Sequence, residues 1–150
     1  MMRKAAFLGA AAGLALAVPA QGQELDGVGL TLGNMGNPFF VQVARGAEAK
    51  AKELGGDGVQ VTAVSADYDL SKQYSQIDNF IASGADIILV NAADPDAIEP
   101  AVRRAQEAGV VVVAVDVAAK GADATVTKNN VEAGQKACQY IAEKLNGEGK

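Results

Sequence analysis

The sequence predicts a doubly wound α/β domain built on a parallel sheet. Short apolar runs recur about every 25 to 30 residues, and amphipathic helical patterns fill the intervals between them. Strands that alternate with helices form βαβ units with right-handed crossovers, which place helices on both faces of the sheet. The chain has 150 residues, of which 49% are hydrophobic and 21% charged, and this length suits one such domain.

The first twenty residues are predicted to be an export signal outside the fold. Arg3 and Lys4 precede an apolar run from Ala5 to Val18, and a small residue follows at Ala20. This pattern precedes signal-peptidase cleavage, which we expect after Ala20 or, as second choice, after Gly22. A transmembrane anchor is the alternative, but it needs about 18 or more consecutive apolar residues, and this run is shorter. No cysteine for a lipid anchor follows, so we expect a soluble protein in the periplasm of a two-membrane bacterium.

The first two units begin at residue 27. Residues 28–32 read as a strand and about 38–54 as a helix, which a run of glycines stops. Apolar residues at three- and four-residue spacings give this helix one buried stripe: Phe40, Val43, Ala47, Ala51 and Leu54. Residues 59–64 form the second strand. Asp69 is expected to cap a second helix that ends before Gly84.

Two further units complete the pattern. The unbroken apolar run 87–90 is typical of a strand buried on both faces. A helix then reaches about residue 108 with Pro100 in its first turn, followed by a strand at 110–115 and a weaker one at 124–127. The last helix, about 130–145, aligns five residues on one face, among which Cys138 is expected to be a small core residue: Val131, Gly134, Cys138, Ile141 and Leu145.

Composition excludes several kinds of chemistry. The chain has no histidine, which removes catalytic triads, Cys-His pairs and histidine metal sites. Its one cysteine can form neither an intrachain disulfide nor a zinc site. Thirteen basic and eighteen acidic residues give a net charge of −5, which argues against a nucleic-acid surface. We therefore expect no cofactor, no metal and no nucleic-acid partner.

Ligands of open α/β sheets lie outside the carboxyl ends of the strands. Four loops reach this edge, and they supply amide, carboxylate and aromatic groups: Asn34, Asn37, Phe39, Phe40, Asp67, Asn91 and Asp116. Carboxylates and amides pair with neighbouring hydroxyls, and a phenyl ring covers the C–H face of a sugar. The mixture predicts a neutral polyhydroxylated ligand.

Asp116 and Asn91 are the strongest of these candidates because each ends an apolar strand, where a polar group needs partners. Phe39 lies off the helical stripe and is expected to face the ligand, whereas Phe40 lies on the stripe and favours packing. Asn34 and Asn37 are either turn residues or ligand contacts.

Asp94 and Asp96 precede a helix and are expected to be caps rather than ligand contacts.

Four motifs in this order resemble the periplasmic sugar-binding proteins of the ribose-binding type, the solute receptors of ABC importers. They are Asn37-Pro38-Phe39-Phe40, Ile88-Leu89-Val90-Asn91, Val115-Asp116 and Lys128-Asn129-Asn130-Val131 with Gly134. The resemblance covers about residues 27–147. It implies that Asn37, Phe39, Phe40, Asn91 and Asp116 contact a sugar, with Asn34, Asp67 and Asn129 as weaker candidates.

The resemblance also implies two lobes that close on the ligand by hinge motion. Residues 21–128 would be the N-terminal lobe. The hinge crossing would lie near Lys128 and Asn129, and residues 129–150 would begin a second lobe, so the chain looks like the N-terminal part of a protein about twice as long. Its partners would be a monosaccharide or polyol and a membrane permease, and the full-length protein would be a monomer.

One position departs from the family pattern. Ribose-type receptors usually follow the strand-ending aspartate with an arginine, whereas this chain has Val117. A charge-assisted donor is therefore missing, so that another pentose, a hexose or a sugar alcohol fits as well as D-ribose.

Three other functions are conceivable for a chain of this fold. A dinucleotide enzyme would carry Gly-x-Gly-x-x-Gly after the first strand, but Gly33 and Gly36 have the wrong spacing and two aromatic residues follow them. A sugar-responsive transcription factor would begin with a basic helix-turn-helix instead of an export signal. A receptor for a small signalling furanose remains an open alternative, because its ligand is also small and hydroxylated.

Overall fold

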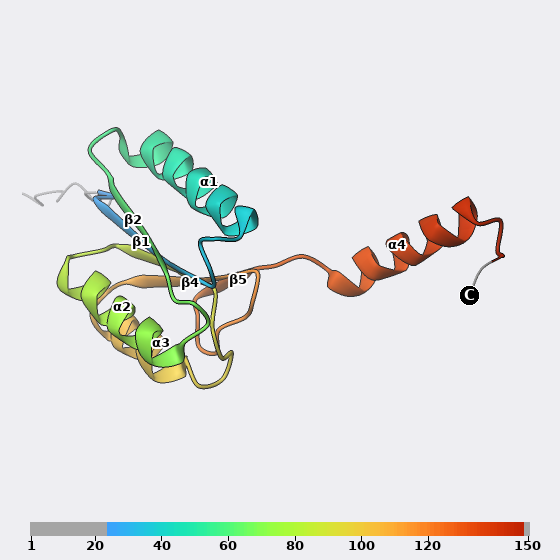
Figure 1. Cartoon of the computed structure of the whole chain (residues 1–150). Helices are drawn as coiled ribbons and strands as arrows, with labels where there is room; N and C mark the ends of the chain where they lie inside the picture. The colour runs from blue at the N-terminus through green and yellow to red at the C-terminus, as the bar shows by residue number, and fades with distance from the viewer. Residues whose placement is uncertain (1–23, 149–150) are drawn as a thin grey trace, which may run out of the picture.

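A five-stranded parallel sheet forms the centre of the computed structural model, which describes residues 24–148 (Figure 1). The strands are β1 (Gly27–Leu32), β2 (Gln60–Ser65), β3 (Ile87–Val90), β4 (Val111–Val115) and β5 (Ala124–Val126). Their order across the sheet is β2-β1-β3-β4-β5, and every neighbouring pair is parallel. The predicted export signal, residues 1–20, lies outside the described residues.

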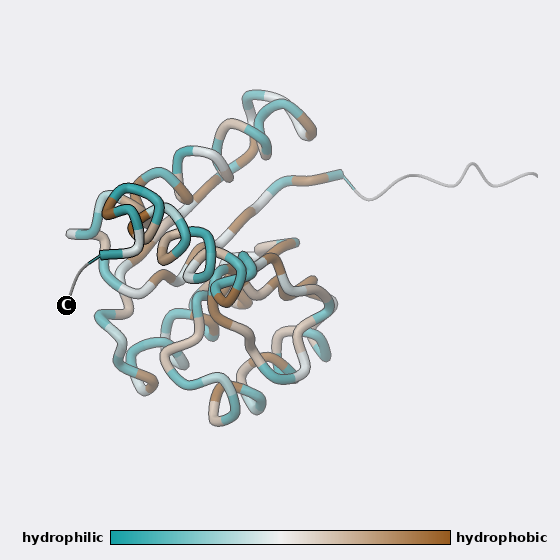
Figure 2. Tube along the Cα trace, turned by 90° about the vertical axis from the view of Figure 1, so that its right-hand side faces the viewer, coloured by the Kyte–Doolittle hydropathy of each residue, from teal (hydrophilic) through white to brown (hydrophobic). Residues whose placement is uncertain are grey.

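Helices cover both faces of this sheet, which confirms the doubly wound α/β class. Helix α1 (Pro38–Gly55) lies on one face, and α2 (Leu70–Ala82) and α3 (Glu99–Glu107) lie on the other (Figure 1). Hydrophobic segments concentrate where the strands lie between the helices, and hydrophilic ones follow the outer helix surfaces (Figure 2). Because helices cover the two faces, ligands can reach the sheet at the amino or carboxyl ends of its strands, here called its amino and carboxyl edges.

Strand β3 shows how the two layers share one apolar run. Ile88 and Val90 are buried in the core on the α2 and α3 side. Ile87 and Leu89 point to the other face and are partly buried against the α1 core. The run is thus apolar on both faces, as its sequence predicts, but the α1 face is covered less completely.

Helix starts follow local side-chain chemistry. The side-chain oxygen of Asn37 accepts a hydrogen bond from the Phe39 amide at the start of α1, and Asp69 accepts one from the Lys72 amide at the start of α2. Both bonds satisfy amides that have no partner within their helix. Pro100 lies in the first turn of α3, where its missing N–H leaves no gap.

The predicted caps Asp94 and Asp96 form hydrogen bonds in the turn that precedes α3, and neither is the N-cap residue of that helix. Oδ1 of Asp94 accepts hydrogen bonds of 2.9 Å from the amides of Asp96 and Ala97, while Asp96 contributes its main-chain carbonyl to Glu99. The N-cap position of α3 is Ile98, which makes no side-chain cap bond.

Helix α4 (Asn130–Lys144) extends away from the sheet, and all its residues are exposed (Figure 1). The prediction that Cys138 is a core residue is therefore wrong for this structure, because no described element covers the apolar face of α4. Val131 is 72% exposed and Ile141 56%. Leu54 also leaves its predicted stripe at the end of α1, where it is 69% exposed.

Among residues 24–148, no helix combines the length and apolar character needed to cross a membrane.

Gly29 should tolerate no side chain. A Cβ on this residue of β1 would lie 2.5 Å from Cγ of Phe80, which is buried in the core. We expect Gly29→Ala to lower the free energy of unfolding by about 1–3 kcal/mol through overpacking, as measured by urea unfolding.

Gly46→Ala is the matched control. Gly46 lies within α1, and a Cβ there would meet nothing within 4 Å. This change should raise stability by up to about 1 kcal/mol through helix propensity. Equal effects of the two substitutions would contradict the packing described here.

Candidate functional site

Three strand ends meet at the carboxyl edge of the sheet. Because β1, β3 and β4 are adjacent and parallel, the residues that follow them lie side by side. The Asn91 amide donates to the Thr31 carbonyl at 2.9 Å, which extends the β1–β3 pairing by one residue. Nδ2 of Asn91 donates to the Val115 carbonyl at 3.1 Å and lies 3.5 Å from Oδ2 of Asp116. The two candidates that the sequence ranks highest are therefore neighbours.

The side chain of Gln73, in α2, forms hydrogen bonds with the loop that begins at Asn91. Its side chain is fully buried, and its Nε2 donates to the Asn91 carbonyl at 2.8 Å. Its Oε1 accepts a hydrogen bond of 2.9 Å from the Ala93 amide. One buried amide thus satisfies both a donor and an acceptor of the loop after β3, so that this loop has a fixed conformation.

Asp116 adopts an unusual backbone conformation at the end of β4. Its φ is 65°, in the left-handed region that aspartate and asparagine tolerate better than most residues. Its amide donates to the Val126 carbonyl at 2.8 Å, and its own carbonyl accepts from the Thr127 hydroxyl at 2.9 Å. Its carboxylate forms an ion pair with Lys128. The side chain is half-buried beside Asn91.

The two phenyl rings that begin α1 have different environments. Phe39 is 44% exposed, and Nζ of Lys128 lies 5.2 Å from its ring centroid. Phe40 is 4% exposed and belongs to the core beneath α1, as its place on the helical stripe predicts. The rings meet edge to face with centroids 5.2 Å apart. Phe40 thus supports Phe39, and its own contact with a ligand remains a prediction.

A hollow of about 290 Å³ lies at this edge, between the start of α1 and the ends of β4 and β5. Its walls are mostly apolar, with one ion pair at the rim. The lining residues are Phe39, Val43, Val115, Asp116, Val126, Thr127 and Lys128.

Asn34 and Asn129 have local structural roles. Oδ1 of Asn34 accepts a hydrogen bond of 2.7 Å from the Gly36 amide, which shapes the turn before α1. Asn129 caps α4 through a bond of 3.1 Å from the Glu132 amide.

Asp67 lies in the loop after β2, where it pairs with Lys72 and accepts a hydrogen bond of 2.6 Å from Ser65. Hydrogen bonds from Lys72 first and Ser65 second hold the pKa of the Asp67 carboxyl below its usual value. The carboxylate therefore remains charged at neutral pH.

Tyr68 is a candidate that the sequence analysis does not single out. It is 60% exposed, its φ is 59°, and its amide donates to the Gly33 carbonyl at 3.3 Å. A Cβ on Gly33 would lie 2.5 Å from the Tyr68 ring and 3.0 Å from Oδ1 of Asn91. Gly33 thus brings an exposed aromatic ring next to Asn91. The sequence signal for Tyr68 is that it is an aromatic residue in the loop after β2, which reaches the same carboxyl edge as Phe39.

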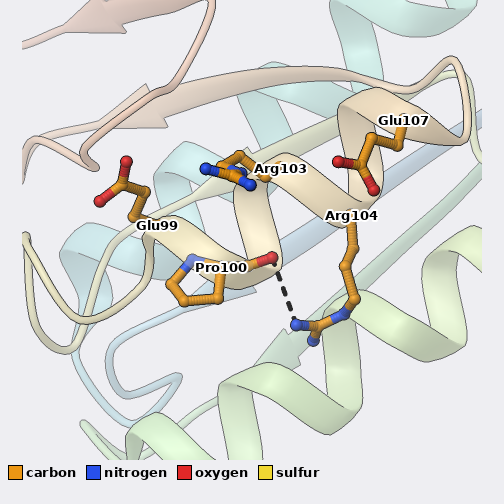
Figure 3. A pocket seen from close by; sticks show the side chains of 5 residues that line it. All are labelled: Glu99, Pro100, Arg103, Arg104 and Glu107. Atoms are coloured by element: carbon orange, nitrogen blue, oxygen red, sulfur yellow. Dashed lines mark hydrogen bonds between the residues drawn. The ribbon is translucent and has the colours of Figure 1, made fainter.

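A second hollow, of about 390 Å³, lies on the outer surface of α3 (Figure 3). Residues of that helix alone line it: Glu99, Pro100, Arg103, Arg104 and Glu107. Arg104 is already paired with Asp78 of α2 and donates to the Pro100 carbonyl. The residues 24–148 contain no group of three or more acidic or thiol side chains that could hold a metal ion. The carboxyl edge is therefore the better candidate site.

The fold and this edge define a parallel α/β lobe with amide and carboxylate side chains at its strand ends. The chain belongs to the periplasmic binding protein domain family, whose model matches residues 28–150. It is 39% identical over 120 residues to the ribose import binding protein RbsB of Bacillus subtilis, an alignment that covers 79% of this chain and 38% of that protein. The chain spans about half or less of the curated relatives it matches.

Two solved structures share the fold at 27% sequence identity. The Caulobacter myo-inositol binding protein bound to myo-inositol gives a TM-score of 0.67, with 86% of this chain and 44% of that one covered. An ABC transporter solute binding protein from Clostridium phytofermentans with bound β-D-glucose gives 0.69, with 83% and 39% covered. The proteins of this family that the chain resembles are binding proteins rather than enzymes.

Loss of the Gln73 amide should destabilise the edge. Gln73→Leu removes the partners of the Asn91 carbonyl and the Ala93 amide while keeping the side chain's approximate size. We expect the free energy of unfolding to fall by about 2–4 kcal/mol, because one buried and one partly buried polar group lose their hydrogen bonds.

Gln42→Leu is the control, since Gln42 is exposed on α1 and should change stability by no more than about 0.5 kcal/mol. Similar melting temperatures for both variants would show that Gln73 does not hold the loop.

Proposed function

We propose that the full-length protein is a periplasmic solute receptor that captures a monosaccharide or related polyol and delivers it to an ABC importer. The observation that carries the proposal is the adjacency of Asn91 and Asp116 at the carboxyl edge. Asn91 is only 2% exposed and its Nδ2 already donates to the Val115 carbonyl, so it would mainly hold the loop beside Asp116. The Asp116 carboxylate would accept from ligand hydroxyls. The exposed ring of Phe39 at the rim supplies an apolar surface for the C–H face of a sugar.

The charges at the edge favour a neutral ligand. The Lys128 ammonium balances the Asp116 carboxylate, so the pair offers no net charge to a ligand ion. Hydroxyl groups can exploit such a site because they both donate and accept. Asn37 would contribute its amide nitrogen, since its oxygen is bonded to the Phe39 amide. Phe40 would act mainly by backing Phe39.

The ligands named for similar proteins support the same chemical class. Ribose, myo-inositol and β-D-glucose are all neutral, polyhydroxylated and able to form a ring, although they differ in size and stereochemistry. Their diversity, together with Val117 beside Asp116, leaves the individual sugar open. The same comparisons favour a transport receptor over an α/β enzyme.

Export, the two-lobed arrangement and the partners are inferred from the family and the sequence. Residues 1–20 would direct export and be removed, and residues 21–128 would form one lobe. Asn129 and α4 would lead into a second lobe that completes the site. The partner would be the membrane permease of the importer, and the receptor would act as a monomer.

A thermal-shift screen of the full-length protein tests the proposal. The panel contains D-ribose, D-glucose, xylitol, myo-inositol and furanoses that serve as bacterial signals. A rise in melting temperature with a sugar or polyol is the expected result, because a ligand that binds only the folded state stabilises it. A response to the signalling furanoses alone would favour the receptor alternative. No response to any compound would overturn the proposal.

Asp116→Asn should weaken binding without disturbing the backbone. Asparagine tolerates the left-handed φ of this residue, but it lacks the charge that strengthens hydrogen bonds to hydroxyls. We expect the Kd of the best panel compound to rise roughly 10- to 100-fold, as measured by calorimetry. Asp57→Asn, in the exposed turn after α1, should leave the Kd unchanged. Equal Kd values for wild type and Asp116→Asn would remove Asp116 from the site.

Residues 21–150 alone should bind the same compound only very weakly, because this chain would carry half of the ligand contacts. Calorimetry on this segment and on the full-length protein provides the comparison. Tight binding by the segment would contradict the two-lobed arrangement.

A further inference from the structure

Lys128 contacts two of the proposed ligand groups at once. Its ammonium pairs with Oδ1 of Asp116 and lies 5.2 Å from the centroid of the Phe39 ring. Its side chain is 57% exposed and lines the hollow at the carboxyl edge. Among residues 24–148, no other cation lies over an aromatic ring of this edge. Lys128 therefore sits where a sugar would bind.

The contacts of Lys128 are those that a hydroxylated ring would need. A sugar hydroxyl would donate to the Asp116 carboxylate, and the C–H face of the ring would cover Phe39. The ammonium now donates to that carboxylate and lies over that ring. The ammonium occupies the space in front of Oδ1 and over the Phe39 ring, so a sugar ring bound there and the Lys128 side chain would compete for the same surfaces.

Three successive residues of the segment that carries Lys128 contact Asp116, beyond the β4–β5 pairing. The Val126 carbonyl accepts from the Asp116 amide, the Thr127 hydroxyl donates to the Asp116 carbonyl, and Lys128 pairs with the carboxylate. Two of these bonds involve the main chain of Asp116 and survive when a ligand takes its carboxylate. Only the Lys128 contact is exchangeable, and it lies two residues before α4 begins.

We propose that Lys128 is an internal competitor that occupies the sugar position in the ligand-free protein and leaves it when a sugar binds. This inference rests on the proposed function and adds a residue that sets its affinity. The ammonium is held by an exposed ion pair and one cation–π contact, both of modest strength. A sugar can therefore displace it, but at a measurable loss of affinity.

Lys128→Met in the full-length protein tests this role. Methionine has a similar unbranched length and no charge, so it keeps the stem and removes the competitor. We expect the Kd for the compounds that bind in the panel to fall roughly three- to tenfold, as measured by calorimetry. An unchanged or higher Kd would overturn the inference, because it would make Lys128 neutral or a ligand donor.

Two variants control for charge and for folding. Lys128→Arg keeps a cation at this position, so its Kd should match that of the wild type. Lys120→Met removes a lysine that pairs with Glu99 outside the site, so its Kd should also be unchanged.

A salt titration of the wild-type protein tests the same role even if Lys128→Met does not fold. Raising NaCl from 0.02 M to 0.5 M shortens the Debye length to below about 10 Å and weakens the Lys128–Asp116 ion pair. Because a sugar then displaces the lysine more easily, the Kd of a neutral sugar should fall.

The outcomes separate this inference from the proposed function. Wild-type binding that does not tighten with salt, or that Lys128→Met does not improve, overturns the role of Lys128 and leaves the receptor function standing. Absence of binding by the wild type and all variants, across the whole panel, overturns both.

Discussion

The candidate site depends on the parallel pairing of β1, β3 and β4. This pairing brings the ends of three strands to one edge, where Asn91 donates across the sheet to the carbonyl that ends β4. That single bond links the loops after β3 and β4, and the buried Gln73 fixes its donor from the other side. Without the common edge, Asn91 and Asp116, 25 residues apart in sequence, would have no reason to meet.

The strands and helices could be predicted to within one or two residues because apolar runs and helical stripes depend on local sequence alone. The same stripe correctly placed Phe40 in the core. Position along a strand likewise predicted that Asn91 and Asp116 share an edge. These features follow from periodicity and from the rule that parallel strands end together, and they need no knowledge of individual contacts.

Other features depend on which surfaces meet, and the sequence does not contain that information locally. The stripe of α4 predicted burial of Cys138, but a stripe indicates only that a face is apolar and not what covers it. The pairing of Lys128 with Asp116 depends on the register of β5 beside β4, set by a three-residue strand. Tyr68 gains its place beside Asn91 from two consecutive left-handed residues, which its sequence gives little reason to expect.

The left-handed backbone of Asp116 limits which residues can stand at the end of β4. Glycine, asparagine and aspartate accept such a conformation readily, whereas most other side chains would strain the end of β4. A new preference can therefore hardly arise by replacing the carboxylate with a longer or branched group. The neighbouring positions 117 and 128 have no such restriction, since neither has a positive φ. If Asp116 binds the ligand as proposed, changes in ligand choice would arise at the residues around it rather than at the acceptor itself.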